Sequence, residues 1–217
     1  MTYSLVTDYT TLPVTLAEVK NAIKLDTSVT TDDALIFSMI RTATDACQEY
    51  TGLSLLTQTW NLYLDRFPAK PMEWWDGVRQ AAYITEHRSY IEIQKSPLQS
   101  VTHLKTYSDT DTATTFSASN YYVDTASKPA RLVLRNSAIW PSDVLRTANG
   151  IEIQFIAGYG SAQNNVPHGL RQGILTHVAN MYENRGDMLG PDGSFQDIPP
   201  IPAGSIVLYN QKRVMRL

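Results

Sequence analysis

The sequence contains little cysteine, little charge and no long apolar run. Its single cysteine, Cys47, excludes an internal disulfide framework and predicts a reducing compartment. Charged residues make up 18% of the chain and the net charge is -3, so we expect no broad basic surface for nucleic acid. No apolar run approaches the ~20 residues that cross a bilayer, and residues 1–13 lack the basic and apolar parts of a secretory signal. We therefore expect a soluble protein made in the cytoplasm.

The sequence motifs of common enzyme and metal sites are also missing. The loop Gly158–Gly160 has neither the GxGxxG pattern nor the lysine of a P-loop, and no GxSxG nucleophile elbow occurs. Without a second cysteine or a histidine pair at i, i+4, the sequence does not predict a zinc site. The four histidines are His87, His103, His168 and His177. We predict no catalytic residues, no metal site and no cofactor.

Three helices are predicted from start and stop signals. A capping box at Thr15–Glu18 predicts a helix that continues to Ile23. The acidic pair Asp32–Asp33 begins a second helix, whose apolar residues recur at helical spacing until Gly52 takes the C′ position. Pro167 fits the first position of a third helix with one apolar face.

Between the second and third helices the apolar period changes from helical to two. This alternation over short segments, separated by turn residues, predicts an antiparallel sheet, sandwich or small barrel. The polar run 108–120 is expected to be a hairpin tip. The predicted strands are 60–64, 90–94, 101–107, 121–124, 131–135 and 151–157.

The predicted fold class is therefore α+β. We expect a small helical bundle, made of two N-terminal helices and one C-terminal helix, with an inserted antiparallel β domain and an extended C-terminal arm. The predicted boundaries are 1–54 for the N-terminal helical part, 55–160 for the β domain, 161–190 for the C-terminal helix and 191–217 for the arm.

Two features suggest contact with a partner. Trp74 and Trp75 lie in a proline-flanked loop, where they could close the β core, anchor a protein partner or stack on a sugar or base. The end of the chain is apolar and then basic, unlike most disordered termini, which predicts an arm that orders on a partner by strand addition or groove docking. The residues of this arm are Ile206, Val207, Leu208, Tyr209, Lys212, Arg213, Val214, Arg216 and Leu217.

Several motifs occur in an order that covers most of the chain. They are LPVTLAEVKNAIKLD (12–26), TDDALIFSMIRTATDACQEYTGLSLLTQTW (31–60), KSPLQSVTHLKTY (95–107), YYVD (121–124), FIAGYG (155–160) and VPHGLRQGILTHVANMYENRGD (166–187). In this order and spacing the sequence resembles the head–tail connector, or adaptor, proteins of tailed bacteriophages and of phage-derived gene transfer agents. The segment 68–88 fits the family pattern least well.

The resemblance implies a structural protein of the virion, not an enzyme, that is assembled in the host cytoplasm. Its copies, commonly twelve, would form a ring beneath the portal at the head–tail junction. The ring would extend the DNA channel without sequence-specific DNA binding and without membrane contact, and would offer a docking surface to the next connector, a stopper or a tail protein. The arm 206–217 would bind the portal protein, and the β domain would lie outside the ring or face its neighbours.

An alternative hypothesis does not depend on the resemblance. In it the protein is a protein- or glycan-binding module that uses the Trp74–Trp75 loop of the β domain.

Overall fold

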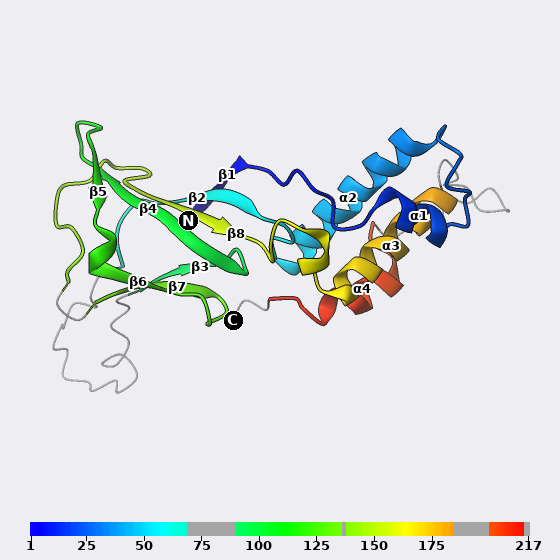
Figure 1. Ribbon diagram of the computed structural model, residues 1–217. Coiled ribbons are helices and arrows are strands. Elements are labelled where there is room, and N and C mark those ends of the chain that lie inside the picture. Colours follow the sequence, from blue (N-terminus) through cyan, green and yellow to red (C-terminus); the bar gives the residue numbers. More distant parts are fainter. Residues whose placement is uncertain (69–89, 136–137, 185–199, 215–217) are drawn as a thin grey trace, which may run out of the picture. The chain divides into compact units, whose positions relative to one another are not determined.

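The computed structural model describes residues 1–68, 90–135, 138–184 and 200–214 (Figure 1). They form four α-helices and two antiparallel sheets, which confirms the predicted α+β class. The chain divides into two compact units, a β unit (1–8 and 58–157) and a helical unit (9–57 and 158–217). Within the described residues, no helix combines the length and apolar character needed to span a membrane.

The helical unit contains α1 (Leu16–Ala22), α2 (Asp33–Thr51), α3 (His168–Glu183) and α4 (Ala203–Asn210), with a short 3-10 helix, Gln163–Asn165, before α3. The predicted capping box is present, because the Thr15 hydroxyl accepts a hydrogen bond from the Glu18 amide and the Glu18 carboxylate accepts one from the Thr15 amide. Gly52, with φ of 73°, ends α2 as predicted. Helix α3 begins one residue later than expected, with Pro167 at the N-cap.

The prediction of an extended C-terminal arm is wrong for residues 203–210, which form α4. The carbonyl of Pro202 accepts the amides of Ser205 (2.9 Å) and Ile206 (3.0 Å), and so closes the first turn. The fixed φ of proline suits the start of a helix. Tertiary packing of the apolar residues then outweighs the strand preference of Ile206 and Val207.

One continuous core holds the helical unit together. The inner faces of α1, α2, α3 and α4 contribute to it, together with the segment that follows α2. Its fully buried members include Val19, Ile36, Ile40, Cys47, Leu55, Leu170, Ile174, Val178 and Tyr209.

The β unit consists of a five-stranded sheet, ordered β1-β2-β8-β4-β5, and a three-stranded sheet, ordered β3-β7-β6 (Figure 1). All pairings are antiparallel, as predicted. The strands are β1 (Thr2–Thr7), β2 (Gln58–Leu64), β3 (Tyr90–Ile93), β4 (Leu98–Tyr107), β5 (Ala113–Phe116), β6 (Tyr121–Asp124), β7 (Ala130–Leu134) and β8 (Ile151–Ala157), with a 3-10 helix at Ala118–Asn120.

Alternation along the strands produces the core of this unit. In the row across the middle of the large sheet, Leu62, Ile153 and Leu104 are register partners and all are buried. Two strands were not predicted. Strand β1 precedes the first helix, and β5 lies inside the polar run that was expected to be only a hairpin tip.

The segments that flank the inserted strands contact each other directly. The amide of Thr57 donates to the carbonyl of Gly160 (3.1 Å), and the amide of Tyr159 donates to the carbonyl of Leu55 (3.2 Å). Gly158 has φ of 135°, and a Cβ at this position would overlap the carbonyl of Leu56. Only glycine therefore fits between these segments.

Gly158→Ala should destabilise the helical unit by about 3 kcal/mol or more, because it adds both a steric overlap and backbone strain. Gly52→Ala is the matched control, since Gly52 also has positive φ but a Cβ there would have no atom within 4 Å; it should cost only about 1 kcal/mol. Urea unfolding followed by far-ultraviolet circular dichroism measures both. Equal losses for the two variants would show that the close approach to Leu56 is unimportant.

Candidate partner-binding site

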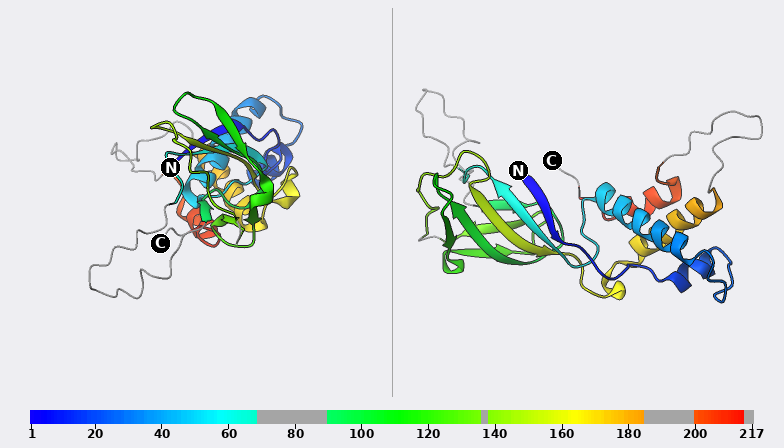
Figure 2. Two further views of the ribbon diagram at one scale, coloured as in Figure 1. Left: turned by 90° about the vertical axis from the view of Figure 1, so that its left-hand side faces the viewer. Right: turned by 90° about the horizontal axis from the view of Figure 1, so that it is seen from above.

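The predicted binding arm is held against the helical unit as a C-terminal segment, residues 200–214. Its helix α4 has one buried side, represented by Ser205 and Tyr209, and one exposed side, represented by Val207. Figure 2 shows α4 beside α3 in both views, in agreement with their close packing. The segment therefore has a side that anchors it and a side that is available to a partner.

Gly173 of α3 has no side chain, which leaves space for Tyr209, the buried residue that anchors α4. A Cβ on Gly173 would lie 2.5 Å from Cε1 of Tyr209 and 3.4 Å from Cβ of Leu208. Only a residue without a side chain allows the ring of Tyr209 to lie this close to α3. Gly173 is thus required for the position of α4.

Polar contacts fix the beginning of the segment. The hydroxyl of Ser205 donates to the carbonyl of Gly173 (2.9 Å), and Nε2 of His177 lies 3.1 Å from the carbonyl of Pro200. The carbonyl can only accept, so Nε2 carries the proton in this contact. Burial lowers the pKa of His177, which keeps the ring neutral.

The end of the segment is bound to the last turn of α2. The hydroxyl of Tyr50 donates to Oδ1 of Asn210 (2.9 Å), and the amide of Val214 donates to the carbonyl of Thr51 (3.0 Å). The guanidinium of Arg213 lies 4.7 Å from the centre of the Tyr50 ring. The contact with Thr51 also satisfies one of the carbonyls left free at the end of a helix.

Tyr209 lies in the same core as Cys47, the single cysteine of the chain. Cys47 and Tyr209 are both buried in the core of the helical unit, close enough for their side chains to interact electrostatically. Burial raises the pKa of Cys47 to about 12, and burial also raises the pKa of Tyr209. Because the thiolate is the reactive form, Cys47 should react slowly while α4 is in place.

The structure separates the nine predicted arm residues into distinct groups. Val207, Lys212 and Arg213 are exposed, whereas Tyr209 is buried. Ile206, Leu208 and Val214 are half-buried. Arg216 and Leu217 lie outside the described residues, as do Trp74 and Trp75 of the alternative hypothesis.

An open cavity of about 630 Å³ adjoins the exposed side of the segment. It lies between the C-terminal end of α2 and the last residues of the segment, and polar and apolar atoms both line it. Its lining residues are Glu49, Tyr50, Thr51, Gly52, Asn210, Arg213 and Val214. A cavity of this size can receive side chains of a protein partner.

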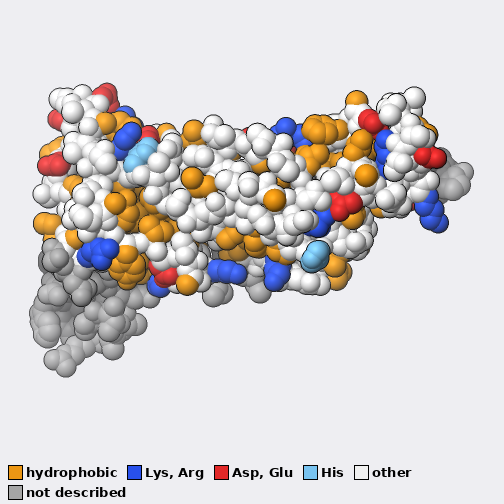
Figure 3. Space-filling view, viewed as in Figure 1, with side chains coloured by type: hydrophobic (Ala, Val, Ile, Leu, Met, Phe, Trp, Pro, Cys, Tyr) orange, Lys and Arg blue, Asp and Glu red, His pale blue; other side chains and the backbone are white. Residues whose placement is uncertain are grey.

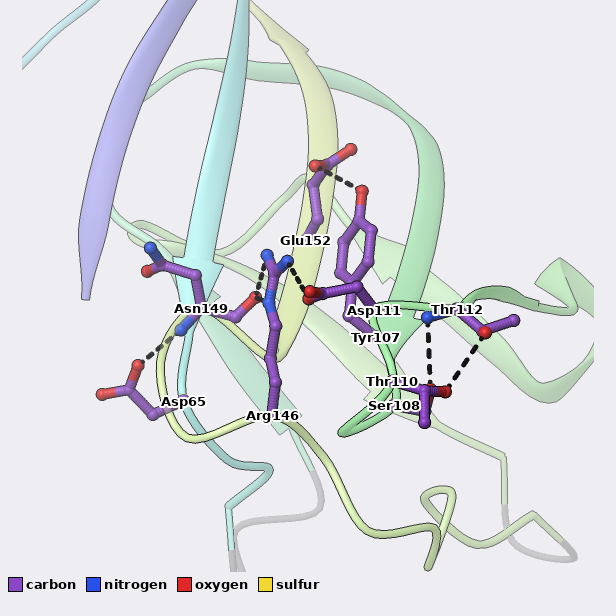
Figure 4. A network of polar contacts seen from close by, with 9 residues as sticks. All are labelled: Asp65, Tyr107, Ser108, Thr110, Asp111, Thr112, Arg146, Asn149 and Glu152. Carbon is purple, nitrogen blue, oxygen red and sulfur yellow. Dashed lines mark hydrogen bonds and ion pairs between the residues drawn. The ribbon is translucent and has the colours of Figure 1, made fainter.

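The β unit contains a second group of polar residues, centred on Arg146 (Figure 4). The guanidinium of Arg146 donates to the carbonyl of Asn149 (2.9 and 3.1 Å) and to Asp111 (3.2 Å), and lies over the ring of Tyr107. The Asn149 amide in turn donates to Asp65 (2.9 Å). These contacts join the β4–β5 turn to the loop before β8, which is a structural role. Sequence analysis missed the group because its members are distant along the chain.

The charged and metal-ligating side chains of the described residues are scattered. They contain no group of three or more His, Cys, Asp or Glu side chains arranged to hold a metal ion. On the face shown in Figure 3, the Lys and Arg side chains of the described residues lie dispersed among uncharged ones, with no continuous basic patch.

Comparison with known proteins agrees with these observations. Residues 13–108 match the family model for phage gp6-like head–tail connector proteins. The resemblance predicted from the sequence is thereby confirmed. The match covers α1, α2 and strands β2, β3 and β4. The C-terminal segment lies beyond it.

Solved structures share the fold over the whole chain. A chain from the neck of an empty gene transfer agent (GTA) particle, computed with C6 symmetry, is 22% identical with a TM-score of 0.74. A chain from the virion of a native GTA particle is 20% identical (0.71), and one from a native neck computed with C12 symmetry is 23% identical (0.69). Each comparison covers 100% of this chain and 97% of the other. No curated protein matches the sequence.

Gly173→Ala should displace α4, because the added methyl group overlaps the Tyr209 ring. We expect a loss of about 1–3 kcal/mol, as is usual for overpacking, and faster reaction of Cys47 with a thiol reagent. Gly169→Ala, on the same helix, is the matched control, since the nearest atom to its Cβ is 3.6 Å away; it should leave the labelling rate unchanged. Equal labelling rates for both variants would contradict the proposed role of Gly173.

Proposed function

We propose that this protein is a structural, non-enzymatic connector in the neck of a phage-like particle, either a tailed bacteriophage or a gene transfer agent. The observation that carries the proposal is the match of residues 13–108 to the gp6-like head–tail connector family. The chains of similar fold come from GTA necks and a GTA virion, which supports the same place for this protein. It would be assembled in the host cytoplasm and reside at the head–tail junction of the virion.

In this proposal, twelve copies form a ring beneath the portal. A neck computed with C12 symmetry, which contains a chain of this fold, supports that number. Ring contacts between single copies can be weak, because a portal that presents many binding sites multiplies them. A chain that is monomeric in isolation is therefore compatible with the proposal.

The ring would extend the DNA channel without holding the DNA. A channel through which DNA slides should bind phosphates weakly, and dense basic linings bind them strongly. The net charge of -3 and the dispersed basic side chains in Figure 3 are consistent with this requirement. No sequence-specific DNA contact and no membrane contact is part of the proposal.

The C-terminal segment would bind the portal protein with its exposed side. Val207, which is 64% exposed, offers an apolar contact, and Lys212 and Arg213 add positive charge. Tyr209 would act as the internal anchor of the segment. Other surfaces of the ring would receive the next connector, a stopper or a tail protein.

Native mass spectrometry of the chain, alone and mixed with the portal protein of the same genome, tests this function. We expect a complex with one copy of this chain for each portal subunit. If the two proteins remain separate at micromolar concentration and moderate salt, the connector proposal is wrong.

The double variant Val207→Asp/Lys212→Glu should weaken portal binding by about tenfold or more, the usual cost of changing a central interface contact. Both residues are exposed, so folding should not change. Val144→Asp/Lys128→Glu is the matched control, with the same substitutions at exposed positions of the β unit. Titration of labelled protein with portal compares them, and equal affinities would remove the segment from the interface.

A further inference from the structure

The two edge strands of the five-stranded sheet, called its margins below, have an unusual composition. Strand β1 pairs with β2 and β5 pairs with β4, and within the described residues neither has a strand on its outer side. Such margins expose unpaired backbone groups that can bind another strand. Proteins commonly protect them with charged residues or proline.

Neither margin is protected by charge or proline; of the other features that protect sheet edges, β1 has one β-bulge and β5 is only four residues long. Strand β1 (TYSLVT) and strand β5 (ATTF) contain no charged residue and no proline. Leu5 is 42% exposed and Val6 is 50% exposed, so two apolar side chains lie next to each other on β1. Exposed apolar residues concentrated on one short strand indicate a surface that another protein covers.

Strand β1 is firmly held, although it is close to the chain end. The ring of Tyr3 packs edge-on against Phe155, with 6.2 Å between ring centres, and its hydroxyl accepts the amide of Gln94 (3.0 Å). A β-bulge at Val6 separates the register pairs of Leu5 and Thr7. The margin is therefore a preformed strand, which pairs at lower entropic cost than a disordered segment.

The directions of the strands restrict what can pair with β1. Four successive pairings, β1–β2, β2–β8, β8–β4 and β4–β5, are antiparallel, so β1 and β5 run in the same direction. In a twelve-membered ring, neighbouring copies differ by a rotation of about 30°. This rotation cannot bring two β1 strands together as an antiparallel pair. A head-to-tail contact can instead bring β1 to the opposite margin, β5, of the neighbouring sheet, and because β1 and β5 run in the same sense this pairing would be parallel.

We propose that β1 of one copy pairs in parallel with β5 of the next copy, so that the five-stranded sheet continues from subunit to subunit. Because the two margins differ, this contact is head-to-tail, the type that closes into a ring. The inference rests on the proposed ring and assigns to the β unit a surface for a second copy of this chain. A short parallel pairing is weak by itself, and so suits assembly on a portal.

The first test places charges on the margin. Leu5→Lys/Val6→Lys should raise the concentration needed for ring assembly on the portal by at least about tenfold. The matched control is Ile139→Lys/Val144→Lys, the same kind of change at side chains that are 80% and 74% exposed in the β unit. The control should assemble like the wild type. Thermal unfolding followed by tryptophan fluorescence verifies that both variants fold.

The outcomes distinguish this inference from the proposed function. If the unmodified chain ignores the portal, the connector function fails. If the unmodified chain assembles and Leu5→Lys/Val6→Lys assembles equally well, only the strand pairing is wrong. If the control is impaired as strongly as the test variant, the effect comes from added charge and the inference is also rejected.

The second test measures whether β1 and β5 of neighbouring copies pair in parallel. It uses disulfide formation between two populations of copies, one with a cysteine on β1 and one with a cysteine on β5. Thr2→Cys and Ser4→Cys, which lie in the regular part of β1 before the bulge, are each combined with Ala113→Cys and Thr115→Cys in rings on the portal. Parallel pairing predicts that the preferred β5 partner shifts toward Thr115 as the cysteine moves from 2 to 4. An opposite shift, or no disulfide, overturns the proposal. Buried Cys47, with its raised pKa of about 12, should not compete.

Discussion

The insertion of the β unit depends on the close approach of two backbone segments in the helical unit. A domain can be inserted where the chain leaves and returns at nearby points. Here the amides of Thr57 and Tyr159 join the two segments by hydrogen bonds, and Gly158 lies against the carbonyl of Leu56 where no Cβ fits. The helical pattern that ends at Gly52 therefore leads to strands for an architectural reason, without catalytic or phosphate-binding residues at the junction.

The sequence correctly predicted those helix ends that are fixed by residues close together in the chain, namely the start of α1 and the end of α2. The capping box at Thr15 and the glycine at the end of α2 each satisfy backbone groups within a few residues, so sequence alone identifies them. Strands β1 and β5 were missed because their alternation is weak: a bulge interrupts β1 at Val6, and β5 is mostly exposed threonine and alanine. Both are defined by pairing with distant strands, which no local pattern encodes.

The candidate site shows more clearly that a local sequence pattern does not encode contacts between distant residues. The composition of residues 206–217 predicts a segment that binds a partner, and this stays a prediction, but the helical form of the segment depends on residues far away in sequence. Tyr209 is buried only because Gly173 carries no side chain, and Tyr50 and Thr51 hold the end of the segment. Composition therefore singles out the segment, whereas the division into the anchor Tyr209 and the exposed Val207 required the structure.

The division of the C-terminal segment into a buried anchor and an exposed side matters for the proposed assembly of the ring on the portal. A segment already ordered by internal contacts loses less conformational entropy on binding than a free arm, so a modest exposed contact at Val207 can suffice for each copy. Weak contacts between neighbours then add to a ring only when many copies are held at high effective concentration. A connector with this balance would stay dispersed in the cytoplasm and close its ring only at the portal, since a premature ring elsewhere would consume subunits without extending a DNA channel.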